Sequence, residues 1–240
     1  MNDRSAPREG GVAHSYLLMK PPGFVHVPGG VQAEVALDAV VRQLGDAEVT
    51  PEFENAFGAA LSSVVEADGA GVVLDSFVTA GPLQETGMTA SIVVAAVPVR
   101  DGPDADLDRL HLGRVTRGAD ALAVGGEPAV AWDDEPPSQP RAGAQPNGRV
   151  LRRRTALSRV TGADDVLVSL VLMVVEAREV GLDQGVTRQI ADALVELFDA
   201  LLTTVRWVDD HGRVLSDRHT PSTTCTSPTT REEDDDHRHA

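Results

Sequence analysis

The most apolar stretch of the chain, VLVSLVLMVV, spans Val166–Val175. Alternate residues of an extended strand face opposite sides, and here both sides are apolar apart from Ser169. Such a run is typical of a strand that is covered on both faces of a sheet. We therefore predict that this stretch forms the central strand of the fold.

A second pattern, with a period of three to four residues, runs through Val186–Val208. Its apolar positions are Val186, Ile190, Leu194, Leu197, Phe198, Leu201, Val205 and Val208. Charged residues such as Arg188, Asp192 and Glu196 fall between them, as on the solvent side of an amphipathic helix. We predict a long C-terminal helix over Val186–Val208 that covers the central strand.

Upstream of this pair, turn residues divide the chain into further elements. Phe24–Val27, set between proline- and glycine-containing turns, is predicted to be a short strand. Two amphipathic helices are predicted next, at Val31–Leu44 and Pro51–Asp68. Gly71–Thr79 and Met88–Val99 then have the composition of two hairpin strands joined by a longer loop.

The middle of the chain has weaker patterns. Asp104–Val115 is predicted to be a short helix, and Asp120–Val124 to be extended. Pro128–Asp134 and Arg149–Val160 are predicted to form a second hairpin around 136–147, a loop rich in Pro, Ser, Gly and Gln. We expect this hairpin to join the same sheet.

The order of these elements predicts the fold class. It is α+β, with an antiparallel sheet of about five to six strands flanked by helices on both faces. We expect a single domain over residues 21–208. Residues 1–20 and 209–240 are polar without periodicity, the second segment ending in the acidic run Glu232–Asp236, and both are expected to be disordered.

Charge and composition exclude some classes of binding partner and indicate the cellular compartment. The formal net charge is −16, and Lys20 is the only lysine, so we expect no binding to nucleic acid, which requires clustered positive charge. The apolar patch Tyr16–Met19 is too short for a secretory signal, and no apolar run is long enough to span a bilayer. Cys225 is the single cysteine. We therefore expect a cytoplasmic protein without disulfides.

Common catalytic motifs are missing from the sequence. Lys20 precedes Pro21 and is not part of a phosphate-binding loop, no Gly-x-Ser-x-Gly elbow occurs, and no histidine is followed by glutamate. Only two histidines, at 26 and 111, lie near the predicted fold. A grouping of Asp75, Ser76, Asp108 and His111 is conceivable, but no spacing links them. We predict no catalytic residue, metal site or cofactor.

The one basic concentration lies on the predicted strand 149–160. It comprises Arg149, Arg152, Arg153, Arg154 and Arg159. Alternation places Arg152 and Arg154 on one face and the other three on the opposite face. The sequence favours cross-strand ion pairs with Asp133, Asp134 and Glu135, and leaves open a surface that docks a partner or an anion.

The chain resembles a known group in its overall order of elements. Pro-Pro-Gly-Phe at residues 21–24, Pro28, the strand meander and the closing segment Phe198–Trp207 resemble small actinobacterial proteins with a PsbP-like (LpqN-type) fold over residues 21–208. The lipoprotein signal and cysteine of the LpqN type are absent. The resemblance implies a non-enzymatic accessory or interaction protein that engages another protein. The alternative is an enzyme with a pocket between the sheet and the helices of Val31–Asp68.

Overall fold

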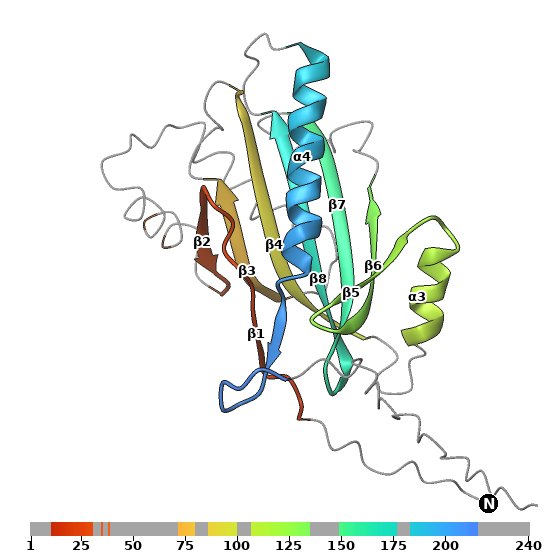
Figure 1. Ribbon diagram of the computed structural model, residues 1–240. Helices are drawn as coiled ribbons and strands as arrows, with labels where there is room; N and C mark the ends of the chain where they lie inside the picture. The colour runs from red at the N-terminus through yellow and green to blue at the C-terminus, as the bar shows by residue number, and fades with distance from the viewer. Residues whose placement is uncertain are drawn as a thin grey trace, which may run out of the picture.

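The computed structural model describes residues 11–30, 35, 38, 72–79, 86–99, 107–134, 149–176 and 183–215. The main element of the fold is one seven-stranded antiparallel sheet in the order β2-β3-β4-β8-β7-β6-β5 (Figure 1). Its strands are β2 (Phe24–Pro28), β3 (Val72–Thr79), β4 (Met88–Pro98), β5 (Asp120–Val124), β6 (Glu127–Asp133), β7 (Arg149–Val160) and β8 (Ala163–Glu176). A two-stranded sheet pairs β1 (Ser15–Leu17) with β9 (Arg206–Val208), and the helices of the described part are α3 (Leu107–Val115) and α4 (Gln184–Leu202).

β8 is the middle strand of the sheet, as predicted. It pairs with β4 on one side and β7 on the other. Val168, Leu170, Leu172 and Val174 are buried in the main core, whereas Val171 and Met173 on the opposite face are only half-buried. The apolar run therefore identified the strand correctly, but its two faces are not equally covered.

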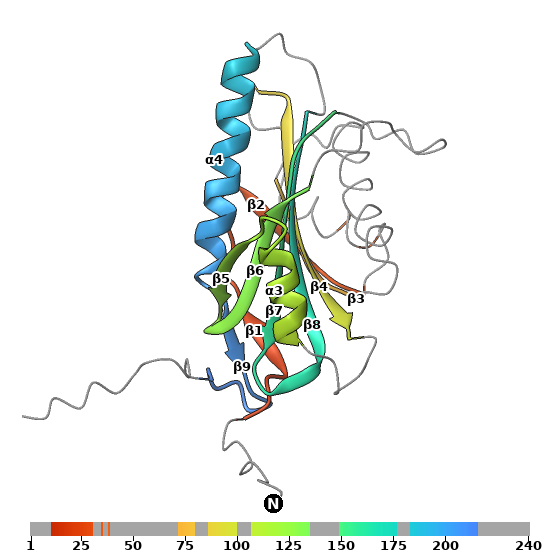
Figure 2. The same cartoon turned by 90° about the vertical axis from the view of Figure 1, so that its right-hand side faces the viewer.

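α4 lies along the face of the sheet that carries Leu170 and Leu172 (Figures 1 and 2). Asp183 caps its N-terminus by accepting a hydrogen bond from the backbone N–H of Gly185 at 2.7 Å. Its buried residues Phe198, Leu201 and Leu202 complete the core on that face. The predicted central strand and covering helix are thus confirmed as the centre of the fold.

The prediction that this helix continues to Val208 is wrong. α4 ends at Leu202, and the hydroxyls of Thr203 and Thr204 donate to the carbonyls of Ala200 and Leu201. The chain then becomes β9, whose Trp207 and Val208 are buried. Aromatic and β-branched residues favour a strand once a pairing partner is present, and β1 provides that partner.

The predicted α+β class, with helices on both faces of the sheet, is also wrong. The described part is mostly β-structure, with seven strands in the main sheet instead of five to six. Of the two helices in the described ranges, α4 runs the length of a face, and α3 is a nine-residue helix that contacts the sheet near β6. The predicted helices Val31–Leu44 and Pro51–Asp68 lie outside the described residues, except that positions 35 and 38 are helical.

The N-terminal boundary differs from the expected one. Residues 1–20 are expected to lie outside the fold, but Ser15–Leu17 form β1, in which Tyr16 is opposite Trp207. The short strand has no alternating pattern of its own, and its position depends on β9, which is nearly two hundred residues away in the chain. Past β9, Val214 bridges to Val208 and extends this small sheet.

The β5–β6 hairpin curls from the edge of the sheet toward the C-terminal end of α4 (Figure 1). Gly125 and Gly126 form its two-residue turn with φ of 58° and 80°, the conformation of a type I′ turn. A Cβ atom at Gly125 would lie 2.5 Å from Nε1 of Trp207, which donates to the carbonyl of Val124 at 3.3 Å. Glycine is required here for both the turn and this contact.

Candidate functional site

The arginines of β7 lie on both faces of the sheet, and alternation predicts the face of all but Arg149. The register shift between Val150 and Arg152 brings Arg149 opposite Glu176, in phase with the residues of β8 that face α4. Arg152 and Arg154 face α4, where they pair with Asp192 and Asp199, both at 2.8 Å. On the opposite face, Arg153 pairs with Asp134 at 3.3 Å and Arg159 with Asp108 at 2.9 Å. Arg149 is exposed and has no ion pair with another described residue. Four of the five candidate arginines are therefore committed to contacts within the chain.

Some of these contacts were predicted and others were not. Asp133 and Asp134 pair across the strands with Arg154 and Arg153, as expected, and Glu135 lies outside the described residues. The partners on α3, α4 and β5 were missed. No sequence spacing indicates them, because each pair joins residues that are more than thirty positions apart.

Arg154 is the centre of the largest charged group. Its guanidinium contacts Asp199 of α4 at 2.8 Å, Asp120 of β5 at 2.9 Å and Asp133 of β6 at 3.4 Å. Burial alone would lower the pKa of Arg154, but the hydrogen bonds that its guanidinium donates to Asp199 and Asp120 outweigh this effect and raise the pKa. The residue is charged at any physiological pH, and it ties the curled hairpin to the helix.

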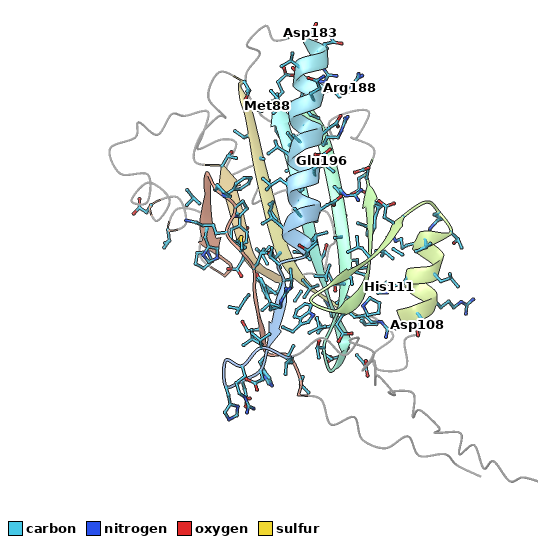
Figure 3. The ribbon with its side chains drawn as sticks, viewed as in Figure 1. Met88, Asp108, His111, Asp183, Arg188 and Glu196 are labelled. Atoms are coloured by element: carbon cyan, nitrogen blue, oxygen red, sulfur yellow. The ribbon has the colours of Figure 1, made fainter. Side chains whose placement is uncertain are left out.

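A second polar group lies between α3 and the opposite face of the sheet. Arg114 stacks over the Trp132 ring at 4.3 Å, and the indole N–H of Trp132 donates to Asp134 at 2.8 Å. His111 is buried on the side of α3 that faces the sheet (Figure 3). Burial, followed by the charge of Arg159, lowers its pKa. Nε2 of His111 is buried and has no hydrogen-bond partner among the described residues.

The third group, Tyr16, Asp75 and His26, was not predicted. The Tyr16 hydroxyl donates to one carboxylate oxygen of Asp75, and Nε2 of His26 is hydrogen-bonded to the other at 2.5 Å. The His26 ring stacks on the ring of Phe77, with the two ring centroids 5.0 Å apart. Burial and the adjacent carboxylate of Asp75 raise the pKa of Tyr16. The group joins β1, β2 and β3, and both oxygens of its carboxylate are used.

The grouping of Asp75, Ser76, Asp108 and His111 is not formed. Asp75 and Ser76 lie on β3, whereas Asp108 and His111 lie on α3, from which Asp108 pairs with Arg159 of β7. β4 and β8 separate β3 from β7 in the sheet. These residues therefore cannot act on one substrate.

Asp209, Asp210 and His211 bring three possible metal ligands within 4.8 Å of one another. The carboxylate of Asp209 already accepts the backbone N–H groups of Arg213 and His211 and the side chain of Arg213. The backbone N–H of Arg213 is the main reason that the pKa of Asp209 is lowered. The arrangement is a turn closed by its own hydrogen bonds, and we assign no metal to it.

The two edge strands of the main sheet differ in how they are covered. On β2, Phe24, Val25 and Val27 are all buried. On β5, by contrast, Ala121 and Ala123 are exposed. An exposed edge strand presents backbone groups that are available to pair with another strand. β5 is therefore the open edge of the described sheet.

The hairpin geometry identifies the outward groups. In the type I′ turn the Val124 carbonyl accepts from the backbone N–H of Glu127. Hydrogen-bonded and non-hydrogen-bonded residue pairs alternate along an antiparallel ladder, so Val124, Leu122 and Asp120 are the residues of β5 that form backbone hydrogen bonds with β6. The N–H and C=O groups of Ala121 and Ala123 consequently point away from β6. Pro128, which has no N–H to donate, stands opposite Ala123 and fits this pattern. No backbone hydrogen bond to another described residue uses these outward groups.

Comparison with known proteins gave no assignment. No family model, curated protein or solved structure matches the chain. No helix in the described residues combines the length and apolar character needed to cross a membrane.

Proposed function

We propose that the protein is a non-enzymatic interaction protein that binds an extended segment of a partner protein along the open edge of β5. The observation that carries this proposal is the exposed pair Ala121 and Ala123, whose outward backbone groups have no described partner. Addition of a strand to such an edge gives main-chain hydrogen bonds without any change in the sheet.

The polar groups of the described residues also support an interaction protein over an enzyme. Both carboxylate oxygens of Asp75 are used by Tyr16 and His26, and Arg154 is surrounded by carboxylates. A catalytic centre needs a nucleophile, or an acid or base, directed at a substrate. These groups are instead directed at one another. The cytoplasmic location and the absence of nucleic-acid binding stay as predictions from composition.

We do not propose the β7 arginines, the alternative left open by the sequence, as the docking surface. Arg152, Arg153, Arg154 and Arg159 would each have to leave an internal carboxylate to bind a partner. Arg149 is the exception, because it is exposed. The predicted loop at 136–147 lies outside the described residues.

A proline substitution tests the proposal. Ala123→Pro removes an outward N–H and leaves the β5–β6 ladder intact, while Ala123→Thr is the matched control that keeps this N–H. Both variants and the wild type, tagged and cross-linked in the native host, are compared by affinity capture after their melting curves are shown to agree. A partner that the wild type and Ala123→Thr retain and Ala123→Pro loses supports edge binding. An identical set of partners for all three contradicts it.

The enzyme alternative has its own test. If the Tyr16–Asp75–His26 group were catalytic, a screen for turnover would find an activity that His26→Ala abolishes in a folded protein. Such a result would replace the interaction proposal.

A further inference from the structure

The side chains around the β5 edge specify what kind of segment fits it. Asp120 and Leu122 project toward the face covered by α4, since Asp120 contacts Arg154 there and Leu122 packs against the main core. Residues of an added strand directly opposite these two positions project to the same face. They would therefore lie beside Leu122 and beside the carboxylates around Arg154.

The charge on that face is negative. Asp120, Asp133 and Asp199 surround the single guanidinium of Arg154, which leaves an excess of two negative charges. The side chains of Asp120 and Asp133 are 66% and 63% exposed, so each retains free oxygen surface toward solvent. A basic side chain placed there would gain charge-assisted hydrogen bonds without displacing Arg154.

We propose that the β5 edge takes an extended, basic segment of a partner, in which an apolar residue is followed two positions later by arginine or lysine. The apolar residue lies opposite Leu122 and the basic residue opposite Asp120, in the antiparallel direction of every other pair in the sheet. The inference rests on the proposed function and adds the chemistry of the partner.

A second copy of the chain fits this edge less well. Antiparallel pairing of two β5 strands about Leu122 places Asp120 opposite Val124, with no basic side chain beside the carboxylates. Two chains that each carry a formal net charge of −16 also repel one another. A basic segment of another protein meets neither obstacle.

Two synthetic peptides test the inference. Both are short, threonine-rich and capped at the ends. One carries the order Val-Thr-Arg, and the other has Glu in place of Arg. Binding is followed at low salt through the amide NMR signals of Ala121 and Ala123 in the full chain. We expect the arginine peptide to bind about tenfold more tightly, because the exchange replaces an attraction by a repulsion of similar size. The ratio should fall as salt is added.

Protein variants locate the effect. Ala123→Pro should abolish binding of both peptides, and Ala123→Thr should retain it. Asp120→Asn keeps an acceptor for Arg154 and should reduce the preference for arginine severalfold. Loss of that preference alone would tie the charge recognition to Asp120.

Other outcomes would overturn the inference, and they distinguish a failure of the basic-segment proposal from a failure of the edge-binding proposal. Equal binding of both peptides, sensitive to Ala123→Pro, would refute the basic partner while the edge proposal stands. Binding that Ala123→Pro does not change, or no binding of either peptide, would refute the site. A dimer of the wild-type chain that Ala123→Pro converts to a monomer would show that a second copy occupies the edge.

Discussion

Replacement of Arg154 by methionine tests how the curled hairpin is held against α4. Methionine keeps an unbranched stem of similar reach and removes only the guanidinium. The Arg154 side chain is 9% exposed, whereas its partners Asp120, Asp133 and Asp199 are 66%, 63% and 42% exposed. The carboxylates therefore remain solvated after the substitution, and the large penalty for an abandoned buried charge does not apply.

The expected loss follows from the remaining contacts. The two short ion pairs, to Asp199 and Asp120, contribute about 0.2–1 kcal/mol each, and the longer contact to Asp133 less. We expect Arg154→Met to lower the free energy of unfolding by about 0.5–2 kcal/mol in total, and by more than Arg152→Met. Arg152→Met is the matched control, because Arg152 has one ion-pair partner among the described residues, Asp192, and its side chain is 35% exposed. Arg152→Met should lower the free energy of unfolding by less than about 1 kcal/mol.

Urea unfolding followed by tryptophan fluorescence measures both changes. Trp132 and Trp207 are the only tryptophans of the chain, and Trp207 touches the hairpin. The slope of the free energy of unfolding against urea concentration should be the same for the wild type and both variants if only native-state contacts change. The difference between the two variants should shrink in high salt. An Arg152→Met loss as large as that of Arg154→Met would refute the role given to Arg154.

Three further predictions concern the pKa shifts and the turn. Tyr16 is the only tyrosine, and its pKa is raised in the folded protein. It should therefore show no phenolate absorbance when the pH passes the usual tyrosine pKa of about 10. Because the unfolded chain ionises there first, the free energy of unfolding should fall as the pH rises above that value. Because the folded pKa of His111 is lowered, the unfolded chain binds more protons below about pH 6.5, and acidification should destabilise the wild type more than His111→Gln in paired unfolding curves. A normal phenolate titration, or parallel pH curves, would contradict these two statements. Gly125→Ala should lower the melting temperature clearly more than Gly118→Ala: both positions have positive φ, but only at Gly125 does a Cβ meet Trp207.

Local sequence was sufficient for the elements whose side chains repeat with a clear period. The run at 166–175 and the helical pattern after Val186 identified β8 and most of α4, because burial of one face enforces the period. The extended segment Asp120–Val124 and the pairing of the strands at 128–134 and 149–160 were also predicted, but the β5–β6 hairpin around Gly125 and Gly126 was not. Ion pairing of the β7 arginines was preferred to docking, and four of the five are paired.

What the sequence left undetermined depends on contacts between distant segments. β1, the change from α4 to β9, and the Tyr16–Asp75–His26 group all require partners that only the folded chain brings near. The same holds for the number of strands, for the helical cover of the sheet, and for the choice of β5 as its exposed edge. Periodicity records which face of a segment is buried. It carries no information about which segment lies beside it, and the tertiary structure alone decides that.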